Sequence, residues 1–555
     1  MKDRAARIFP LVAAIVFSTL LLNWLRREPV AVRRVAPAAA VVPSPALANA
    51  VLRFAAADIL RTVAEALNGP DASAVLQARL ETYFSQPGAL PNESVLTFKD
   101  AAAYQAFLAR AAAAGLDVAG RVDGLLTARV RFAALDGLAG DLLANAGDYL
   151  SVAVNTVVVP PTAPAPEDRA GGSQVAVGNN LLRDLGITGD HSTWGQGITI
   201  AVLDSGVAPD ATLGSRLRTL DLGLGAAPAE GDGHATAVAS LAAGASPDAA
   251  GVAPGADILS IRVTGDDGTS DVFTLAQAIV AAADNGAQII NISMGAYSNS
   301  AYLSNAIGYA MDHGAVIVAS AGNDQASQLT WPAADARVIS VGSIDGVGQQ
   351  DIFSNSSPQL KLTAPGYEVQ AAWLDGERVY FTGTSASAPT VAGAVAAMMN
   401  QNPGMTATDA YQTLLQYSSD GGRAGTDPDY GVGSLNVGWA MNRNDPTRVD
   451  TAISSHYFNG DTGNMEFVVQ NRSGQAVSGL TLNVDAGGGA TATGLPSLQP
   501  GETYTVTVPV DDAQLAAAGK LTFLTTLTNP PGTPPDAVPA NNRAASTLTA
   551  PAASP

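Results

Sequence analysis

The sequence predicts an α/β protein with a mainly parallel sheet that carries helices on both faces, preceded by a small α+β domain and followed by a small β-sandwich. Between about residues 173 and 442, short apolar runs alternate with helical windows, and such alternation implies crossover connections between parallel strands. The segment before this region follows the order βαββαβ, the split βαβ layout. Beyond residue 450, strands divided by Gly, Pro and Asn turns follow one another, as in a sandwich.

The composition limits the chemistry that this chain can perform. It has 555 residues, a formal net charge of -20 and no cysteine. Because phosphate binding needs a basic surface, nucleic acid is not expected as a partner. The lack of cysteine excludes disulfides, thiolate metal sites and Cys nucleophiles. We expect no cofactor and no metal site, and a chain of this length predicts two to four domains.

The N-terminus, residues 1–28, predicts a signal peptide or a membrane anchor. Lys2, Arg4 and Arg7 precede an apolar run over residues 8–25, through which the chain would associate with a membrane. No small-x-small cleavage site follows this run directly, and two arginines come next. The segment is therefore either a cleaved signal or an uncleaved anchor, and a buried helix is a third alternative. Either export reading predicts an extracytoplasmic protein, periplasmic or anchored to the cell envelope, or else secreted.

Residues 29–90 predict a tether and a helical segment. The tether is rich in Ala, Pro and Val, and helical patterns follow over 46–67 and over 71–84, with Asp71 as the expected N-cap of the second. Residues 91–160 form the predicted βαββαβ domain. Its expected elements are strand 94–98, helix 100–114, a hairpin through 121–124, strand 125–132, helix 135–146 and strand 149–159.

Residues 161–172 are rich in Pro, Ala and Gly and predict an exposed, cleavable linker. The α/β domain is expected over 173–445, and the sandwich with a disordered tail over 446–555. Strands of the α/β domain are predicted at 198–203, 258–263, 288–292, 315–319 and 338–341, and those of the sandwich at 465–470, 480–484, 503–510, 521–527 and 544–549.

Asp204 and His234 are two candidate catalytic residues. Asp204 ends the apolar strand 198–203 and therefore lies at the carboxyl edge of the predicted sheet, where ligands bind. A capping or metal-binding aspartate is the alternative. His234 opens a helical window after Gly231 and Gly233, which permit close approach of the backbone. A helix-cap or surface histidine is the alternative there.

Ser385 and Asn323 complete the set of candidates. Ser385 stands just before the helical run 390–400, so free backbone N–H groups and the positive end of a helix dipole would stabilise negative charge beside it. A plain N-cap serine is the alternative. Asn323 follows soon after strand 315–319. Its amide would therefore donate a hydrogen bond to an oxyanion at the same edge of the sheet. A turn asparagine is the alternative.

Five local strings occur together in one order. They are Val-Leu-Asp-Ser-Gly at 202–206, Gly-Val-Ala-Pro at 251–254, Asn-Ile-Ser-Met-Gly at 291–295, Ala-Gly-Asn at 321–323 and Gly-Thr-Ser at 383–385. In this combination, with Asp before His before Ser, residues 173–442 resemble the subtilisin-like serine proteases.

The resemblance implies a catalytic triad and a substrate-binding strand. Ser385 would attack the peptide carbonyl, His234 would act as general base and acid, and Asp204 would hold the imidazole. Asn323 and the backbone N–H of Ser385 would form the oxyanion hole. The substrate, a protein or peptide, would pair with the segments that contain Ser293, Met294, Gly295, Ala321 and Gly322. The βαββαβ segment resembles the propeptide that folds such enzymes and then inhibits them.

Some positions depart from the family's pattern. Ala235-Thr236-Ala237 follow the histidine where the family commonly has Gly-Thr-His, and Ala386-Ser387-Ala388 follow the nucleophile where it commonly has Met-Ala-Ser. These changes affect the expected substrate fit more than catalysis. Residues 245–250 are short where many relatives carry a calcium-binding loop, so the resemblance is not extended to a calcium site. The competing hypothesis is an anchored binding or scaffolding protein with an inert protease fold and a working C-terminal sandwich.

Overall fold

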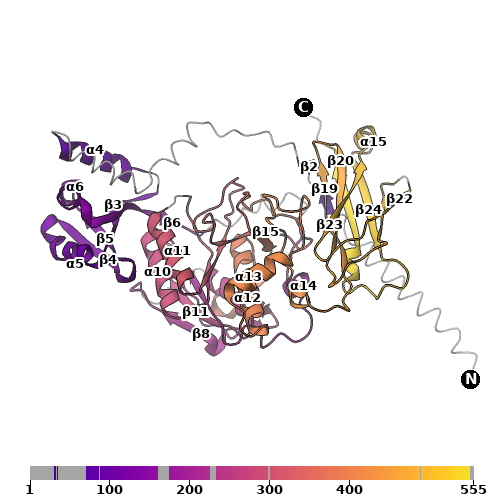
Figure 1. The fold of residues 1–555 in the computed structure, drawn as a ribbon, viewed down its shortest axis with the longest axis horizontal. Coiled ribbons are helices and arrows are strands. Elements are labelled where there is room, and N and C mark those ends of the chain that lie inside the picture. Colours follow the sequence, from indigo (N-terminus) through magenta and orange to yellow (C-terminus); the bar gives the residue numbers. More distant parts are fainter. Residues whose placement is uncertain are drawn as a thin grey trace, which may run out of the picture. The chain divides into compact units, whose positions relative to one another are not determined.

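The computed structural model describes residues 30–32, 34–35, 71–86, 88–160, 174–224, 233–297, 300–487 and 489–550 (Figure 1). The chain divides into two compact units, one of Met1–Ala39 with Pro446–Pro555 and one of Ala40–Asp445. Within the described ranges, no helix is long and apolar enough to cross a membrane. The predicted signal or anchor over 1–28, the helix over 46–67 and the linker 161–172 lie outside these ranges.

A parallel sheet of seven described strands forms the centre of the second unit. In spatial order the strands are β16 (Leu362–Pro365), β15 (Ile339–Ile344), β14 (Val316–Ser320), β13 (Ile289–Ile292), β7 (Thr199–Asp204), β11 (Asp257–Arg262) and β8 (Leu217–Leu220). The strand that comes first in the chain, β7, lies between β13 and β11. The connections therefore leave β7 in both directions, and such a switch point opens a crevice at the carboxyl edge.

Helices cover both faces of this sheet. Side chains of β7 alternate between two cores, with Val202 in one and Leu203 in the other. The first core includes α9 (His234–Ala243) and α12 (Thr384–Gln401), and the second includes α10 (Val272–Asp284) and α11 (Ala301–Asp312). This arrangement confirms the predicted fold class. The remaining elements are α8 (Leu181–Asp184), β9 (Ala245–Ser246), β10 (Ala249–Ala250), β17 (Val369–Ala372), β18 (Arg378–Phe381), α13 (Ala407–Gln416) and α14 (Val437–Met441).

The α+β domain before the central sheet has a sheet of its own. Its strands are β3 (Ala89–Phe98), β4 (Leu116–Val122), β5 (Thr127–Phe132) and β6 (Tyr149–Val158), and its helices are α4 (Ala72–Phe84), α5 (Ala101–Arg110) and α6 (Leu135–Ala144). The spatial order β6-β3-β5-β4 follows the split βαβ layout. A short strand of the central domain, β12 (Ser270–Asp271), adds to the β6 edge by antiparallel pairing. Asp71 is the N-cap residue of α4, as expected, but its side chain makes no capping bond.

The first unit is a β-sandwich. One sheet has the order β1-β25-β24-β21-β22 and the other β2-β19-β20-β23, and the inward residues of both form one apolar core. The bounds are β1 (Val30–Val32), β2 (Arg34–Val35), β19 (Thr451–Asn459), β20 (Asn464–Asn471), β21 (Thr481–Asp485), β22 (Ala490–Gly494), β23 (Thr503–Pro509), β24 (Lys520–Thr528) and β25 (Arg543–Thr549), with helix α15 (Asp512–Ala518). Four of these strands are not predicted from the sequence: β19, β22 and the two strands from the N-terminal tether, β1 and β2.

Candidate active site

Asp204 and His234 meet at the carboxyl edge of the central sheet. Asp204 is the last residue of β7 and His234 the first residue of α9. The Nδ1 atom of His234 lies 2.9 Å and 3.0 Å from the two carboxylate oxygens of Asp204. Asp204 is 1 % exposed, and its Oδ1 also accepts the backbone N–H of Ser205 at 2.7 Å. A buried carboxylate therefore fixes the imidazole, with Nδ1 as the bonded nitrogen.

The residue before His234, Gly233, must be glycine because the indole ring of Trp373 occupies the space that a side chain would need. A Cβ atom at Gly233 would lie only 2.3 Å from the ring of Trp373. The imidazole of His234 also meets the ring of Phe381 edge to face, with centroids 5.2 Å apart. Trp373 and Phe381 flank or end the hairpin of β17 and β18. The Phe381 ring beside the imidazole and the Trp373 ring beside the preceding glycine thus restrict where the histidine side chain can lie.

Ser385 is the second residue of α12, which begins six residues earlier than the helical run predicted at 390–400. Its backbone N–H is one of the four that have no partner inside the helix. Gly383 precedes the helix at φ 140°, a conformation that favours glycine. Because Pro389 has no N–H, the carbonyl of Ser385 lacks its usual partner in the helix. The Ser293 hydroxyl donates to that carbonyl instead, at 3.3 Å.

Ser293 is joined to the nucleophile by a second bond. The Ser385 hydroxyl donates to the backbone carbonyl of Ser293 at 3.3 Å, and the Ser293 hydroxyl is itself oriented by Asn291 at 3.1 Å. Ser385 is 2 % exposed. These contacts place the backbone that follows β13 directly beside the candidate nucleophile.

Asn323 follows β14 and faces the beginning of α12. Its Oδ1 accepts both the backbone N–H of Thr384 at 3.0 Å and the Thr384 hydroxyl at 2.8 Å. These two bonds orient the amide, so that its donor group, Nδ2, lies over Gly383, 2.9 Å from where a Cβ of that residue would stand. The amide therefore presents a donor at the loop that carries Ser385.

Asn355 is a positioning residue that sequence reasoning missed. It is fully buried, and its Oδ1 accepts the backbone N–H groups of Asp324 and Ala326 at 3.0 Å and 2.9 Å. Its Nδ2 donates to the Ala321 carbonyl at 3.2 Å and to the Tyr297 hydroxyl at 2.9 Å. Asn355 thus holds both sides of the loop that contains Asn323. No local sequence signal distinguishes it from a turn asparagine, and the same is true of Phe381.

The expected substrate-binding segment contributes mainly its backbone. The side chains of Met294 and Ala321 are fully buried in the apolar core, so they are not available to a ligand. Gly295 pairs with Val159, the residue after β6: the Gly295 N–H donates to the Val159 carbonyl at 2.9 Å, and the Val159 N–H donates back at 3.2 Å. Gly322, at φ 108°, lies against the Asn355 amide.

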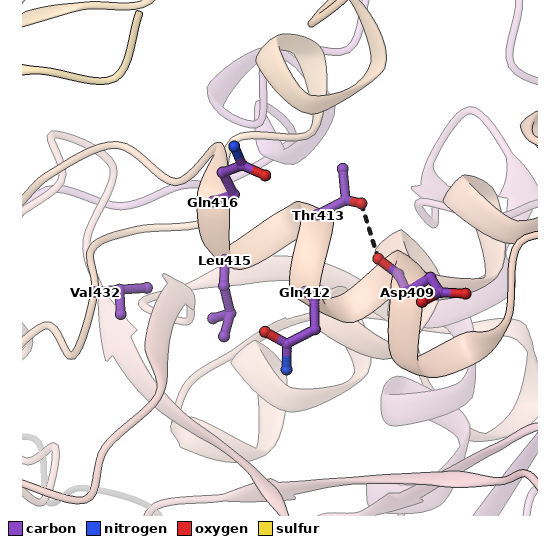
Figure 2. Close-up of a pocket in the computed structure, with 6 residues that line it drawn as sticks. All are labelled: Asp409, Gln412, Thr413, Leu415, Gln416 and Val432. Carbon is purple, nitrogen blue, oxygen red and sulfur yellow. Dashed lines mark hydrogen bonds between the residues drawn. The ribbon is translucent and has the colours of Figure 1, made fainter.

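A shallow depression of about 500 Å³ lies elsewhere, along α13 (Figure 2). It is lined by Asp409, Gln412, Thr413, Leu415, Gln416 and Val432. The carboxylate of Asp409 is already used in the capping box with Thr406, and none of the candidate catalytic residues reaches this surface. In the part of the chain that the structure describes, no group of three His, Asp or Glu side chains is placed to hold a metal ion.

Comparisons with known proteins agree with this geometry. A family model described as the subtilase family matches residues 195–433. Subtilisin BL of Lederbergia lenta is 34 % identical over 211 residues, which are 38 % of this chain and 78 % of that protein. A thermostable alkaline protease of Halalkalibacterium halodurans is 32 % identical over 257 residues, 45 % of this chain and 69 % of that protein. Fold and relatives thus define a serine-type endopeptidase.

The chain belongs to the subtilase family. Two solved structures share its fold. Fervidolysin of Fervidobacterium pennivorans, a keratinolytic enzyme related to subtilisin, matches with a TM-score of 0.56 at 21 % identity over 79 % of this chain and 71 % of that one. The epidermin leader peptide processing protease of Staphylococcus aureus matches with a TM-score of 0.52 at 21 % identity over 63 % of this chain and 98 % of that one.

Proposed function

We propose that the protein is an exported endopeptidase that hydrolyses peptide bonds through an acyl-enzyme on Ser385. The observation that carries this proposal is the bond from His234 Nδ1 to the buried Asp204 carboxylate, because it fixes the tautomer in which Nε2 can accept a proton. The Ser385 hydroxyl, which donates to the Ser293 carbonyl at 3.3 Å, turns from that carbonyl toward His234 Nε2. Ser385 Oγ then attacks the carbonyl carbon of the substrate and gives its proton to His234 Nε2. His234 then passes this proton to the leaving amine, and water releases the acyl group by the reverse sequence.

The oxyanion of each tetrahedral intermediate needs donors at the Ser385 loop. The amide Nδ2 of Asn323 and the backbone N–H of Ser385 supply them, and the second donor lies at the positive end of α12. Asp204 stabilises the imidazolium that forms between the two proton transfers. Since all these groups are held by packing and hydrogen bonds before substrate arrives, little reorganisation is needed during the reaction.

Substrates are proteins or peptides that bind as an added β-strand. Gly295 offers one N–H and one carbonyl to an antiparallel partner, as its pairing with Val159 illustrates. Such pairing recognises main chain before side chains. Because the Met294 side chain between Ser293 and Gly295 is buried, this segment adds little selectivity of its own, and broad specificity follows.

The precursor processes itself, and the α+β domain then inhibits the enzyme. Antiparallel pairing of Val159 with Gly295 directs the chain beyond Val159 back toward Ser293. The Ser293 carbonyl lies 3.3 Å from the Ser385 hydroxyl. The end of β6 therefore leads the polypeptide into the position of a substrate, with the chain running toward the nucleophile.

A partly buried polar contact supports the inhibitory role of this domain. The Arg129 guanidinium lies 3.2 Å from the Asp271 carboxylate and 2.7 Å from Glu93. Asn155 donates to Asp271 at 3.1 Å and accepts the Phe273 backbone N–H at 3.1 Å. Arg129 and Asn155 belong to the α+β domain, whereas Asp271 and Phe273 begin α10. A cut chain would therefore leave the α+β domain bound.

Both flanks of the proposed cleavage site are held. On the far side, the Gln174 side chain donates to Asp351 at 2.7 Å, and the Val175 N–H donates to Asp345 at 3.0 Å. Burial raises the pKa of both carboxyl groups. Because Val159 is paired on the near side, the cut should fall after Val159 and before Gln174.

Expression of wild type and Ser385→Ala in a host that lacks other major extracytoplasmic proteases tests this function. We expect two fragments from wild type, divided between Val159 and Gln174 by N-terminal sequencing, and an uncut, folded and inactive Ser385→Ala protein. Equal cleavage of both would assign processing to another protease. Full peptide hydrolysis by Ser385→Ala, or no labelling of Ser385 by a fluorophosphonate in processed wild type, would refute the catalytic assignment and favour a binding protein.

Export is supported by the basic and apolar pattern of residues 1–28. We propose an extracytoplasmic location, with residues 8–25 either retained as an anchor or removed as part of a signal. N-terminal sequencing of the protein from its own host distinguishes these two outcomes, because an anchored form keeps its original N-terminus.

A further inference from the structure

Residues 30–32 form an edge strand on one sheet of the C-terminal sandwich, and residues 34–35 form an edge strand on the other. In β1, Val30, Ala31 and Val32 pair in parallel with Ser546, Thr547 and Leu548 of β25. After one intervening residue, Arg34 and Val35 of β2 pair in parallel with Phe458 and Asn459 of β19. Two short strands that are close neighbours in the sequence thus pair with different sheets.

Both partner strands would otherwise be sheet edges. Without β1, the first sheet would end at β25, and without β2 the second would end at β19. An unpaired edge presents a row of free N–H and carbonyl groups that readily accepts another strand. Three of the five paired residues, Val30, Val32 and Val35, are of a type enriched in strands. The same segment therefore satisfies two edges that more than 400 residues of chain separate from it.

We propose that residues 30–35 are a clasp by which the sandwich holds the N-terminal part of the precursor after the chain has been cut. The proposal rests on the self-processing function given above. A cut between Val159 and Gln174 separates residues 30–35 covalently from the sandwich. Pairing of β1 with β25 and of β2 with β19 keeps the two fragments together. The ligand of the sandwich edges is thus the protein's own N-terminal strand, and any segment before Val30 stays attached to the mature enzyme.

This clasp can be tested without self-processing. In the Ser385→Ala protein with a C-terminal affinity tag, the recognition sequence of a site-specific protease is inserted between Pro45 and Ala46. The full chain is bound to resin in mild detergent, cut and washed. We expect the fragment of residues 1–45 to remain on the resin. This cut also lies before the α+β domain, so contacts of that domain cannot retain the fragment.

Two replacements define what retains the fragment. Exchange of residues 30–35 for Gly-Ser-Gly-Ser-Gly-Ser should release it, whereas the same exchange at residues 38–43 should not. Both variants keep the apolar run 8–25, so nonspecific adhesion would retain the fragment in both and overturn the proposal. Release from all forms would show that the pairing is too weak for a clasp, and would equally overturn it.

A disulfide provides a second measurement that does not depend on the replacement variant folding. The chain has no cysteine, so Ala31→Cys with Thr547→Cys introduces one pair at partnered positions. After the cut between Pro45 and Ala46, mild oxidation should join the fragment of residues 1–45 to the fragment of residues 46–555. Ala31→Cys with Ala492→Cys, at the opposite edge of the same sheet, is the matched control and should stay open. Absence of the first disulfide, or equal formation of both, contradicts the clasp.

Discussion

Removal of the Asn323 side chain tests the oxyanion role most directly. In Asn323→Ala, two bonds between Oδ1 and Thr384 disappear together with the Nδ2 donor. Loss of one oxyanion-hole donor typically costs about 2.7 to 4 kcal/mol in the transition state, which is a decrease of about 10² to 10³ in kcat. Because the oxyanion exists only after attack, KM should change little.

The two lost bonds to Thr384 affect stability and the position of the loop as well. Each neutral hydrogen bond contributes about 1 kcal/mol net, so the free energy of unfolding should fall by about 2 kcal/mol. Thr384→Val is the control, because it removes the two bonds of the hydroxyl, the one to Asn323 at 2.8 Å and the one accepted from the Gly322 N–H at 3.3 Å, but keeps the backbone N–H bond to Asn323. It should lower the free energy of unfolding by about 2 kcal/mol, as Asn323→Ala does, and leave kcat within tenfold of wild type.

Steady-state hydrolysis of a chromogenic peptide by processed enzyme, combined with urea unfolding of each variant in the Ser385→Ala background, measures both effects. A change of Asn323→Ala confined to KM would contradict the oxyanion role. If Thr384→Val lost as much kcat as Asn323→Ala, the order of the loop rather than the amide donor would explain the loss.

Three further predictions concern the other domains. Deletion of residues 446–555 should leave kcat/KM for small peptides largely unchanged, because every proposed catalytic group lies upstream; collapse in a folded truncation would contradict this. Asp271→Asn keeps an acceptor for Thr274 at the start of α10 but removes the charge beside Arg129, and should weaken inhibition by the added α+β domain at least about tenfold; an unchanged inhibition constant would show that the ion pair of Asp271 with Arg129 does not hold this domain. Burial lowers the pKa of His456 to about 4, so the unfolded chain gains a proton before the folded sandwich does as pH falls. The free energy of unfolding of the sandwich should therefore fall by about 3 kcal/mol between about pH 6.5 and 4. If His456→Gln showed the same pH dependence as wild type in calorimetry, this prediction would be refuted.

Much of the central domain could be predicted from sequence because its strands are short, apolar and bounded by turns. The predicted strands 198–203 and 288–292 agree closely with β7 and β13. Asp204 stands out because it ends such a strand, and His234 and Ser385 stand out because each lies in a run of small residues at the start of a helix. The helix at Ser385 begins six residues before the predicted run 390–400, because α12 contains Pro389 and bonds the freed carbonyl of Ser385 to Ser293.

The sequence by itself determined the fold class, the family resemblance and the identity of the candidate triad, because these depend on patterns that extend over a few residues. Tertiary structure alone decided that Asn355 holds the Asn323 loop, that Val159 pairs with Gly295, and that residues 30–32 and 34–35 add an edge strand to each sheet of the sandwich. The identity of a hydrogen-bonding partner that is distant in the chain depends on which strand edges and carbonyls the rest of the fold leaves unpaired. Local propensity does not contain this information.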